Sequence, residues 1–223
     1  MKKPSEIRVY AAGHRAPAAF ILAHGAGAGH DSTFMVGFAK ALCDLGLDVV
    51  TFNFLYIEDK RRIPDRGPVL EDTYRAVIDG ARNDLESARR ALFIGGKSMG
   101  GRIATQVAAA DGSLPVAGLV LLGYPLHPPG RPERLRDAHL PAVGRPMLFV
   151  QGTRDTFGTP AELAPILGRV TPAPRLHEVS GGDHSFKISA GRDSTRQAAV
   201  HEEIQRVIVE WLTLTAPRPA GGR

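Results

Sequence analysis

The chain has very little cysteine: Cys43 is the one thiol in 223 residues. A single thiol excludes an internal disulfide framework and a zinc cluster built from cysteines. Long apolar runs are also missing, since no segment approaches the roughly 18 consecutive apolar residues of a membrane-spanning helix. The first residues include two lysines but no apolar stretch behind them, so no secretory signal is visible. We therefore expect a cytoplasmic protein without a membrane partner.

A concentrated basic patch is missing as well, although basic residues are in excess. The formal net charge is +5, from 28 Lys and Arg against 23 Asp and Glu. The densest basic cluster, Lys60–Arg66, is interrupted by Pro64 and Asp65 and has little aromatic interleaving. Nucleic-acid recognition needs a denser basic surface, so we expect no nucleic-acid partner. We interpret Lys60–Arg66 as a solvated loop, with a rim facing an acidic substrate as the alternative.

What is present indicates one globular domain. Hydrophobic residues make up 43% of the chain and charged residues 23%, which is ordinary for a folded protein. The length suffices for a substantial core, and neither an internal repeat nor a dividing linker is visible. We expect a domain over residues 1–215 and a disordered tail over residues 216–223, where proline and glycine dominate.

Apolar segments alternate with amphipathic ones, as in a parallel sheet whose strands are joined by helices. The expected strands cover Ile7–Ala12, Ala18–Ala23, Asp48–Phe54, Ala91–Gly95, Val116–Leu122, Pro146–Gln151 and Arg175–Val179. The expected helices cover Thr33–Leu45, Glu71–Arg90, Gly101–Ala110, Pro160–Leu167 and Ser194–Thr213. The pattern predicts an α/β fold with a mostly parallel central sheet flanked by helices.

The most informative segment is Gly96–Gly100, which reads Gly-Lys-Ser-Met-Gly. An apolar run precedes it and a helix-forming stretch follows, which is the context of a nucleophile elbow. The turn is so tight that side chains at Gly96 and Gly100 would collide with the neighbouring elements, while the serine is pushed out above the sheet. Ser98 is therefore the predicted nucleophile.

The same residues resemble the end of a phosphate-binding P-loop, Gly-x-x-x-x-Gly-Lys-Ser. That motif requires a glycine five positions before Gly96, where this chain has Ala91. The intervening residues 92–95 have the pattern of a buried strand and not of a loop that cradles phosphate. The phosphate interpretation fails on both counts.

A serine hydroxyl needs a base within hydrogen-bond reach, and the base needs an acidic partner. Downstream of Ser98, His184 lies in a glycine-rich loop after the last expected strand, and Asp155 follows the strand before it. Asp183 adjoins the histidine, but neighbouring side chains in an extended loop point apart. The order serine, acid, histidine is typical of this arrangement. We predict Asp155 as the acid and His184 as the base.

Backbone donors for a tetrahedral oxyanion are expected at two places. One is the N–H of Met99, directly after the nucleophile. The other is Ala26, with Gly27 close behind, in the glycine-rich loop that follows the second expected strand. The same loop partly matches a dinucleotide-binding motif. That motif needs a glycine at position 30, where this chain has His30, so the match is incomplete. We expect neither a cofactor nor a metal.

Together these motifs resemble the α/β-hydrolase superfamily over nearly the whole chain. The likeness is carried by the elbow, the loop His24–Gly27, the acid turn Gly152–Asp155 and the segment Gly182–Phe186. Within the superfamily the chain looks like the small, lid-less dienelactone-hydrolase-like group. Its Gly-Ala-Gly-Ala-Gly loop and the segment Gly123–Gly130 resemble the testis-expressed and histone-acetyltransferase-complex-subunit-like branch. The resemblance implies an ester- or thioester-cleaving serine enzyme without a cofactor. Dienelactone hydrolases proper carry cysteine where this chain has Ser98, so the resemblance does not extend to dienelactone cleavage itself.

The connection Tyr124–Pro141 leaves the sheet about where many hydrolases insert a lid. It is far too short for a lid domain, so we expect an open or shallowly covered site. Gly27, Tyr124 and His127 are candidate substrate contacts. For Tyr124 and His127, which lie in this connection, a proline-rigidified structural loop is the alternative.

The sequence therefore predicts a serine hydrolase that cleaves small or short-chain carboxylic esters through an acyl-enzyme. A thioesterase or an acyltransferase would use the same residues. A non-catalytic interaction module on the same fold is the remaining alternative, because a fold does not fix a function.

Overall fold

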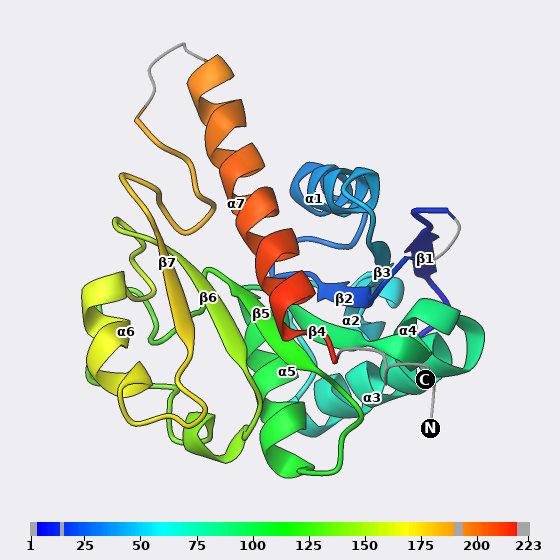
Figure 1. Ribbon diagram of the computed structural model, residues 1–223. Helices are drawn as coiled ribbons and strands as arrows, with labels where there is room; N and C mark the ends of the chain where they lie inside the picture. Colours follow the sequence, from blue (N-terminus) through cyan, green and yellow to red (C-terminus); the bar gives the residue numbers. More distant parts are fainter. Residues whose placement is uncertain (1–3, 14–15, 190–193, 218–223) are drawn as a thin grey trace.

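The computed structural model describes residues 4–13, 16–189 and 194–217. Its centre is a sheet of seven strands in the order β1-β3-β2-β4-β5-β6-β7 (Figure 1). Strand β1 pairs antiparallel with β3, whereas β2 to β7 run parallel. The carboxyl ends of the parallel strands therefore meet at one edge, where α/β proteins bind their ligands.

All the expected strands are present, with ends that differ by a few residues. They are β1 Ile7–Tyr10, β2 Ala19–Ala23, β3 Asp48–Phe52, β4 Leu92–Lys97, β5 Gly118–Leu122, β6 Met147–Gly152 and β7 Arg175–Val179. The central strands β2, β4, β5 and β6 are buried at every position. Their continuous apolar runs reflect a sheet that is covered on both faces.

Helices cover the two faces of the sheet (Figure 1). They are α1 Thr33–Asp44, α2 Leu55–Glu58, α3 Gly67–Asp84, α4 Glu86–Arg90, α5 Met99–Ala110, α6 Pro160–Leu167 and α7 Ser194–Thr215. Apolar side chains of α1 and α7 form one core with the sheet, and those of α3, α5 and α6 form the other. The fold is a single α/β domain of three layers, as predicted.

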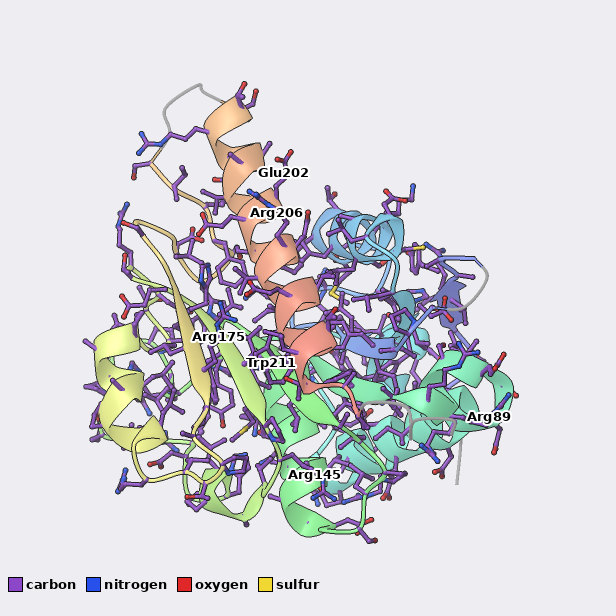
Figure 2. All side chains as sticks on the ribbon, viewed as in Figure 1. Arg89, Arg145, Arg175, Glu202, Arg206 and Trp211 are labelled. Carbon is purple, nitrogen blue, oxygen red and sulfur yellow. The ribbon has the colours of Figure 1, made fainter. Side chains whose placement is uncertain are left out.

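Helix α7 shows how closely the layers pack. Its Trp211 lies against the sheet (Figure 2), with ring centroids 5.9 Å from Phe93 in an edge-on arrangement. A Cβ at Gly118 would come within 2.9 Å of the Trp211 ring, so a glycine in β5 makes room for the indole. The labelled arginines in Figure 2 lie on separate elements and do not form one basic stripe.

The structure corrects two expectations about the helices. The expected helix Glu71–Arg90 is two helices, because Leu85 is extended (φ −112°, ψ 125°) and packs its side chain against the core. The segment Leu55–Glu58, where no helix was expected, forms the short helix α2. Most of the expected tail, residues 218–223, lies outside the described residues, and Ala216 still donates a hydrogen bond to the carbonyl of Leu212.

The connection from β5 to β6 is described throughout, and the short 3₁₀ turn Leu140–Ala142 is its one helical element. This segment therefore adds a loop and no lid domain to the edge of the sheet. Among the helices in the described parts of the chain, none is both long and apolar enough to cross a membrane.

Candidate active site

The three predicted reactive side chains meet at the carboxyl edge of the sheet. Ser98 follows β4, Asp155 follows β6, and His184 lies in the loop after β7. The Nε2 atom of His184 is 2.9 Å from Ser98 Oγ, and its Nδ1 atom is 2.8 Å from Asp155 Oδ2. Residues up to 86 positions apart in the sequence thus form a continuous hydrogen-bonded chain.

Ser98 sits at a strained turn between β4 and α5. Its φ of 52° and ψ of −116° are rare for a residue with a side chain. The glycines around it permit this turn, because a Cβ at Gly96 would lie 2.3 Å from the carbonyl oxygen of Ala23 and one at Gly100 would lie 2.6 Å from it. The expected elbow is therefore a property of tight backbone packing against β2.

Asp155 is almost fully buried, with 2% of its surface exposed, yet both carboxylate oxygens have partners. Oδ2 accepts from the Gln151 side-chain amide at 2.8 Å and faces His184, while Oδ1 accepts from the backbone N–H of Phe157 at 2.8 Å. These donors replace the hydrogen bonds to water that the carboxylate loses on burial, and they fix its orientation. Asp155 is thereby held in a position to orient the imidazole.

The loop that carries His184 is held against the end of β6. A Cβ at Gly152 would lie 2.3 Å from the carbonyl oxygen of Gly182, so only glycine permits this approach. The backbone N–H of Arg154 donates to the same carbonyl at 2.9 Å. On the open side, the Phe157 ring lies 4.2 Å from the His184 ring at an interplanar angle of 30°. The imidazole is therefore positioned by backbone and ring contacts as well as by Asp155.

Lys97, the residue between Gly96 and Ser98, is buried and 8% exposed. Its Nζ donates to the backbone carbonyl of His184 at 2.5 Å and lies 5.7 Å from the centre of the Phe186 ring. Burial lowers the pKa of Lys97 to about 8, and the carboxylates of Asp155 and Asp183 oppose that shift. The lysine therefore links the elbow directly to the histidine loop.

The loop after β2 lies beside Ser98. A Cβ at Gly25 would be 3.5 Å from Ser98 Cβ, which is van der Waals contact. The Tyr56 hydroxyl donates to the Ala26 carbonyl at 3.0 Å and so fixes the position of the loop. Met99 is the first residue of α5, and a backbone N–H at that position has no acceptor within the helix. Both expected oxyanion donors therefore belong to segments that border the serine.

His24 supports this loop from the buried side. The backbone N–H of Phe54 donates to His24 Nε2 at 3.1 Å, so the proton must sit on Nδ1, which lies 2.7 Å from the Gly25 carbonyl oxygen. Burial lowers the pKa of His24 to about 4. A neutral imidazole thus connects the loop after β2 to the segment that follows β3.

Two hollows open on either side of Ser98, and both are also bordered by Ala26 and Phe157. The first, about 410 Å³, is mainly apolar and includes Gly27, Met35 and His184; we call it the apolar hollow. The second, about 310 Å³, includes Asp65, Met99, Arg102 and Arg136; we call it the arginine pocket. Ser98 therefore stands at the junction of two chemically different spaces.

Of the candidate substrate contacts, Gly27 borders the apolar hollow, whereas neither Tyr124 nor His127 borders either hollow. Tyr124 is fully buried, and its hydroxyl donates to the Arg136 carbonyl at 2.6 Å. His127 is 5% exposed, and its Nδ1 lies 2.9 Å from the Pro128 carbonyl oxygen. Both side chains hold the loop in place, which is the alternative that the sequence left open.

The residues of the site that were not expected from the sequence include Gln151, Phe157, Arg102 and Arg136. Gln151 had a signal, because a polar residue ends an apolar run at the carboxyl end of a buried strand. Phe157 and Arg136 had none, since which side chain of an irregular loop turns inward depends on how that loop packs. Within the described ranges, no group of three or more His, Cys, Asp or Glu side chains is placed to hold a metal ion.

Comparison with known proteins places the fold. The chain resembles an α/β serine hydrolase homologue from Coxiella burnetii (TM-score 0.72, 20% identity, covering 93% of this chain and 95% of that one). It also resembles a lid-less serine hydrolase from Xanthomonas campestris (TM-score 0.68, 21% identity, 96% and 90%). A dienelactone hydrolase from Anabaena variabilis is similar too (TM-score 0.68, 18% identity, 97% and 100%). At these identities the likeness shows a shared fold.

The sequence itself gives the family. Residues 16–213 match the α/β-hydrolase domain, a span that includes every strand from β2 to β7 and all three residues of the hydrogen-bonded chain. The protein belongs to the α/β-hydrolase domain family.

Proposed function

We propose that the protein is a serine hydrolase that cleaves small carboxylic esters. The observation that carries the proposal is the hydrogen-bonded chain from Ser98 through His184 to Asp155, with both distances below 3 Å. Two buried donors fix the carboxylate, and the carboxylate and a ring contact fix the imidazole. This is the geometry by which a serine hydroxyl becomes a nucleophile.

In the first half-reaction Ser98 Oγ forms a bond to the ester carbonyl carbon, and its proton passes to His184 Nε2. The N–H groups of Met99 and Ala26 stabilise the oxyanion, a term worth about 2.7–4 kcal/mol for each donor. Asp155 stabilises the imidazolium. The bond from the carbonyl carbon to the alcohol oxygen then breaks, and that oxygen takes the proton from His184.

In the second half-reaction water attacks the acyl-enzyme. His184 takes one proton from the water as its oxygen bonds to the carbonyl carbon. The bond to Ser98 Oγ breaks, and the serine regains its proton from His184. The products are a carboxylic acid and an alcohol, and the protein returns to its initial state without a cofactor.

The open edge of the sheet supports small substrates in this proposal. The apolar hollow measures about 410 Å³, and no lid domain extends it into a long groove. Small esters in solution fit this space better than long-chain lipids held at an interface. Thioester cleavage and acyl transfer use the same residues and remain alternative activities. The assignment to the testis-expressed and histone-acetyltransferase-complex-subunit-like branch is part of the proposal and rests on the resemblance of the sequence motifs.

The proposal is tested with 4-nitrophenyl acetate, butyrate and decanoate and with matching thioesters. We expect turnover of the short esters, and we expect Ser98→Ala to reduce kcat by a factor of about 10³ or more. The control is Ser113→Ala, which changes an exposed serine in the turn before β5. A folded protein that turns over none of the esters would contradict the proposal, and a strong preference for the thioesters would select the thioesterase alternative.

A further inference from the structure

The arginine pocket is not explained by ester cleavage as such. Arg102 and Arg136 border it together with Ser98, so two cationic side chains share one space with the nucleophile. Arg102 is on α5, one helical turn after Ser98, and Arg136 comes from the loop between β5 and β6. Two unrelated segments thus converge on this place.

Arg102 has unused hydrogen-bonding capacity. Its Nε is buried and has no partner, and its Nη1 has only a long contact of 3.5 Å to Gln106 Oε1. The buried Nε does not face the pocket, but the terminal nitrogens of this guanidinium have little protein pairing beyond that long contact. Because Arg102 lines the pocket, an anion there can accept hydrogen bonds from them.

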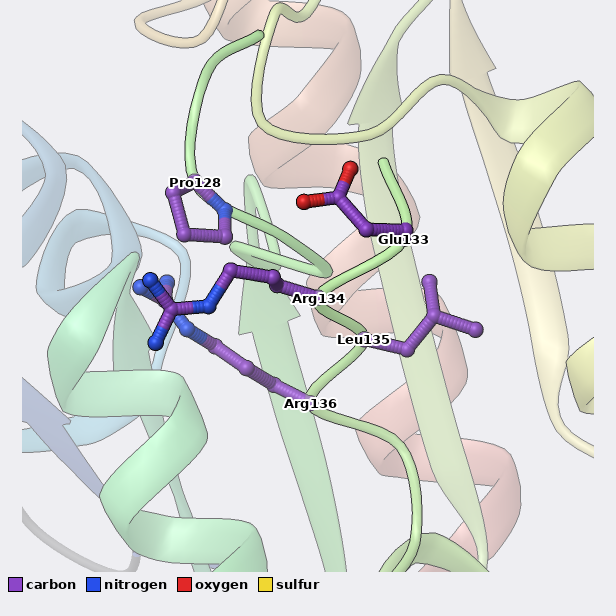
Figure 3. Close-up of a pocket in the computed structure, with 5 residues that line it drawn as sticks. All are labelled: Pro128, Glu133, Arg134, Leu135 and Arg136. Atoms are coloured by element: carbon purple, nitrogen blue, oxygen red, sulfur yellow. The ribbon is translucent and has the colours of Figure 1, made fainter. Parts of the chain in front are cut away.

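Arg136 approaches from the loop, and Figure 3 shows its side chain extending in the same direction as that of Arg134, away from Glu133 and Leu135. Its Nη1 donates to the Pro125 carbonyl at 3.3 Å. Burial lowers the pKa of the Arg136 guanidinium, and the charge of Arg102 lowers it further. Neighbouring like charges of this kind favour an anion between or beside them.

Carboxylates of the protein do not supply that anion. In the described ranges of the chain, the ion pairs with carboxylates include none made by Arg102, Arg134 or Arg136. Asp65 is the acidic residue that borders the pocket; its Oδ1 lies 2.7 Å from Arg61 Nη2, and its Oδ2 is buried without a hydrogen-bond partner. The lining thus combines one carboxylate, which Arg61 already contacts, with the two guanidinium groups of Arg102 and Arg136. The pocket therefore has an excess of positive charge next to the serine.

The position of the histidine decides which half of an ester enters this pocket. His184 borders the apolar hollow and not the arginine pocket. Because His184 must protonate the leaving oxygen, the alcohol half lies on its side, in the apolar hollow. The acyl half then extends toward Met99 and Arg102.

We propose that the arginine pocket binds an anionic group on the acyl half, so that the preferred substrates are half-esters of dicarboxylic acids. The guanidinium groups of Arg102 and Arg136 pair with the free carboxylate while Ser98 attacks the ester carbonyl. This inference rests on the proposed function, and it adds a substrate class to it.

The test compares two esters of 4-methylumbelliferone, the monoadipate and the hexanoate, which share an acyl chain of six carbons and differ in the terminal carboxylate. We expect kcat/KM for the monoadipate to exceed that for the hexanoate by roughly tenfold or more, as charge-assisted hydrogen bonds imply. Arg102→Met and Arg136→Met should each lower this ratio toward one. Arg206→Met, on the exposed side of α7, is the matched control and should keep the ratio (Figure 2).

The outcomes separate the two proposals. Hydrolysis of both esters without a preference for the monoadipate would overturn the anionic pocket and leave the esterase standing. If neither ester is cleaved, the esterase fails, and calorimetry on Ser98→Ala decides about the pocket. If Ser98→Ala binds the monoadipate more tightly than the hexanoate, and adding Arg102→Met removes this difference, the anionic pocket is supported. Equal binding of the two esters by Ser98→Ala would overturn the anionic pocket.

Discussion

At the scale of single residues, Asp155 and Lys97 are buried polar groups beside Ser98 that each satisfy a hydrogen bond and fix a loop. Asp155 is satisfied by Gln151 and by the backbone of Phe157, and Lys97 by the backbone of His184. Buried polar groups must be paired in this way, because an unpaired one costs about 1–3 kcal/mol. At this site the pairing also sets the direction of the reactive side chains.

Lys97 provides a prediction at this scale. Lys97→Met keeps the apolar stem but removes the donor to the His184 carbonyl, so the imidazole should lose part of its alignment. We expect kcat for a short ester to fall by roughly tenfold, the equivalent of one charge-assisted hydrogen bond, with little change in KM. Stability at pH 7 should not fall, because a buried ammonium no longer has to be desolvated.

The control for this lysine is Lys187→Met, an exposed lysine of the same loop whose backbone bonds to Asp183 survive the change. A Lys97→Met protein with the kcat of the wild type would show that the lysine does not position His184.

His24 predicts a pH dependence of stability. Its pKa is about 4 in the folded protein against an ordinary 6.5, so between these values the unfolded chain binds a proton that the folded one does not. The free energy of unfolding should therefore fall as the pH drops from about 6.5 to about 4, by up to roughly 3 kcal/mol from this residue. Denaturant titrations at several pH values measure it. In His24→Asn the slope over this range should be shallower, and equal slopes in the two proteins would rule out His24 as the source.

At the scale of elements, glycines decide how closely the strands and loops approach one another. Gly96 and Gly100 allow the elbow to lie against β2, and Gly152 allows the histidine loop to lie against β6. Close backbone contacts at these glycines therefore fix where the segments that carry Ser98 and His184 lie.

Gly152→Ala tests this assembly. The added Cβ would meet the carbonyl oxygen of Gly182 at 2.3 Å, so the histidine loop must shift. We expect the free energy of unfolding to fall by roughly 1–3 kcal/mol. As a fraction of the wild-type value, kcat should fall by more than the free energy of unfolding does, because His184 moves with the loop. The matched control is Gly80→Ala in α3, where a Cβ meets nothing within 4 Å and a helix former should add about 0.5–1 kcal/mol. Equal stability in the two variants would contradict the assembly described.

Elements and the order of the site residues were predictable from the sequence, and contacts between loops were not. The elbow, Asp155 and His184 follow from local motifs and from the rule that parallel strands end at one edge. The bond from Lys97 to His184 joins residues 87 positions apart, and it depends on the exact packing of a loop. The buried position of Tyr124 could not be predicted for the same reason. A proline-rich sequence shows that a loop is rigid, but it does not show which side chain of the loop turns inward.

At the scale of the whole molecule, three layers leave one edge of the sheet uncovered. The loop between β5 and β6 crosses near this edge, but it adds only a 3₁₀ turn. The chain is thus a compact scaffold whose site is reached without a domain movement.

An open site predicts simple kinetics. Rates with 4-nitrophenyl butyrate should rise hyperbolically with concentration and show no lag, and they should not increase when an ester passes its solubility limit. A lid that opens at a lipid surface would produce such an increase. Steady-state rates with tributyrin on both sides of its solubility limit provide the measurement, and a step in rate there would contradict an open site.

The most direct test of the account is to treat the purified protein with a fluorophosphonate probe and locate the adduct by mass spectrometry. The probe reacts with a serine that a base and an oxyanion site activate. We predict an adduct on Ser98, absent in His184→Ala and retained in Ser113→Ala. A folded wild-type protein that carries no adduct at Ser98 would contradict the claim that these residues form a working catalytic site.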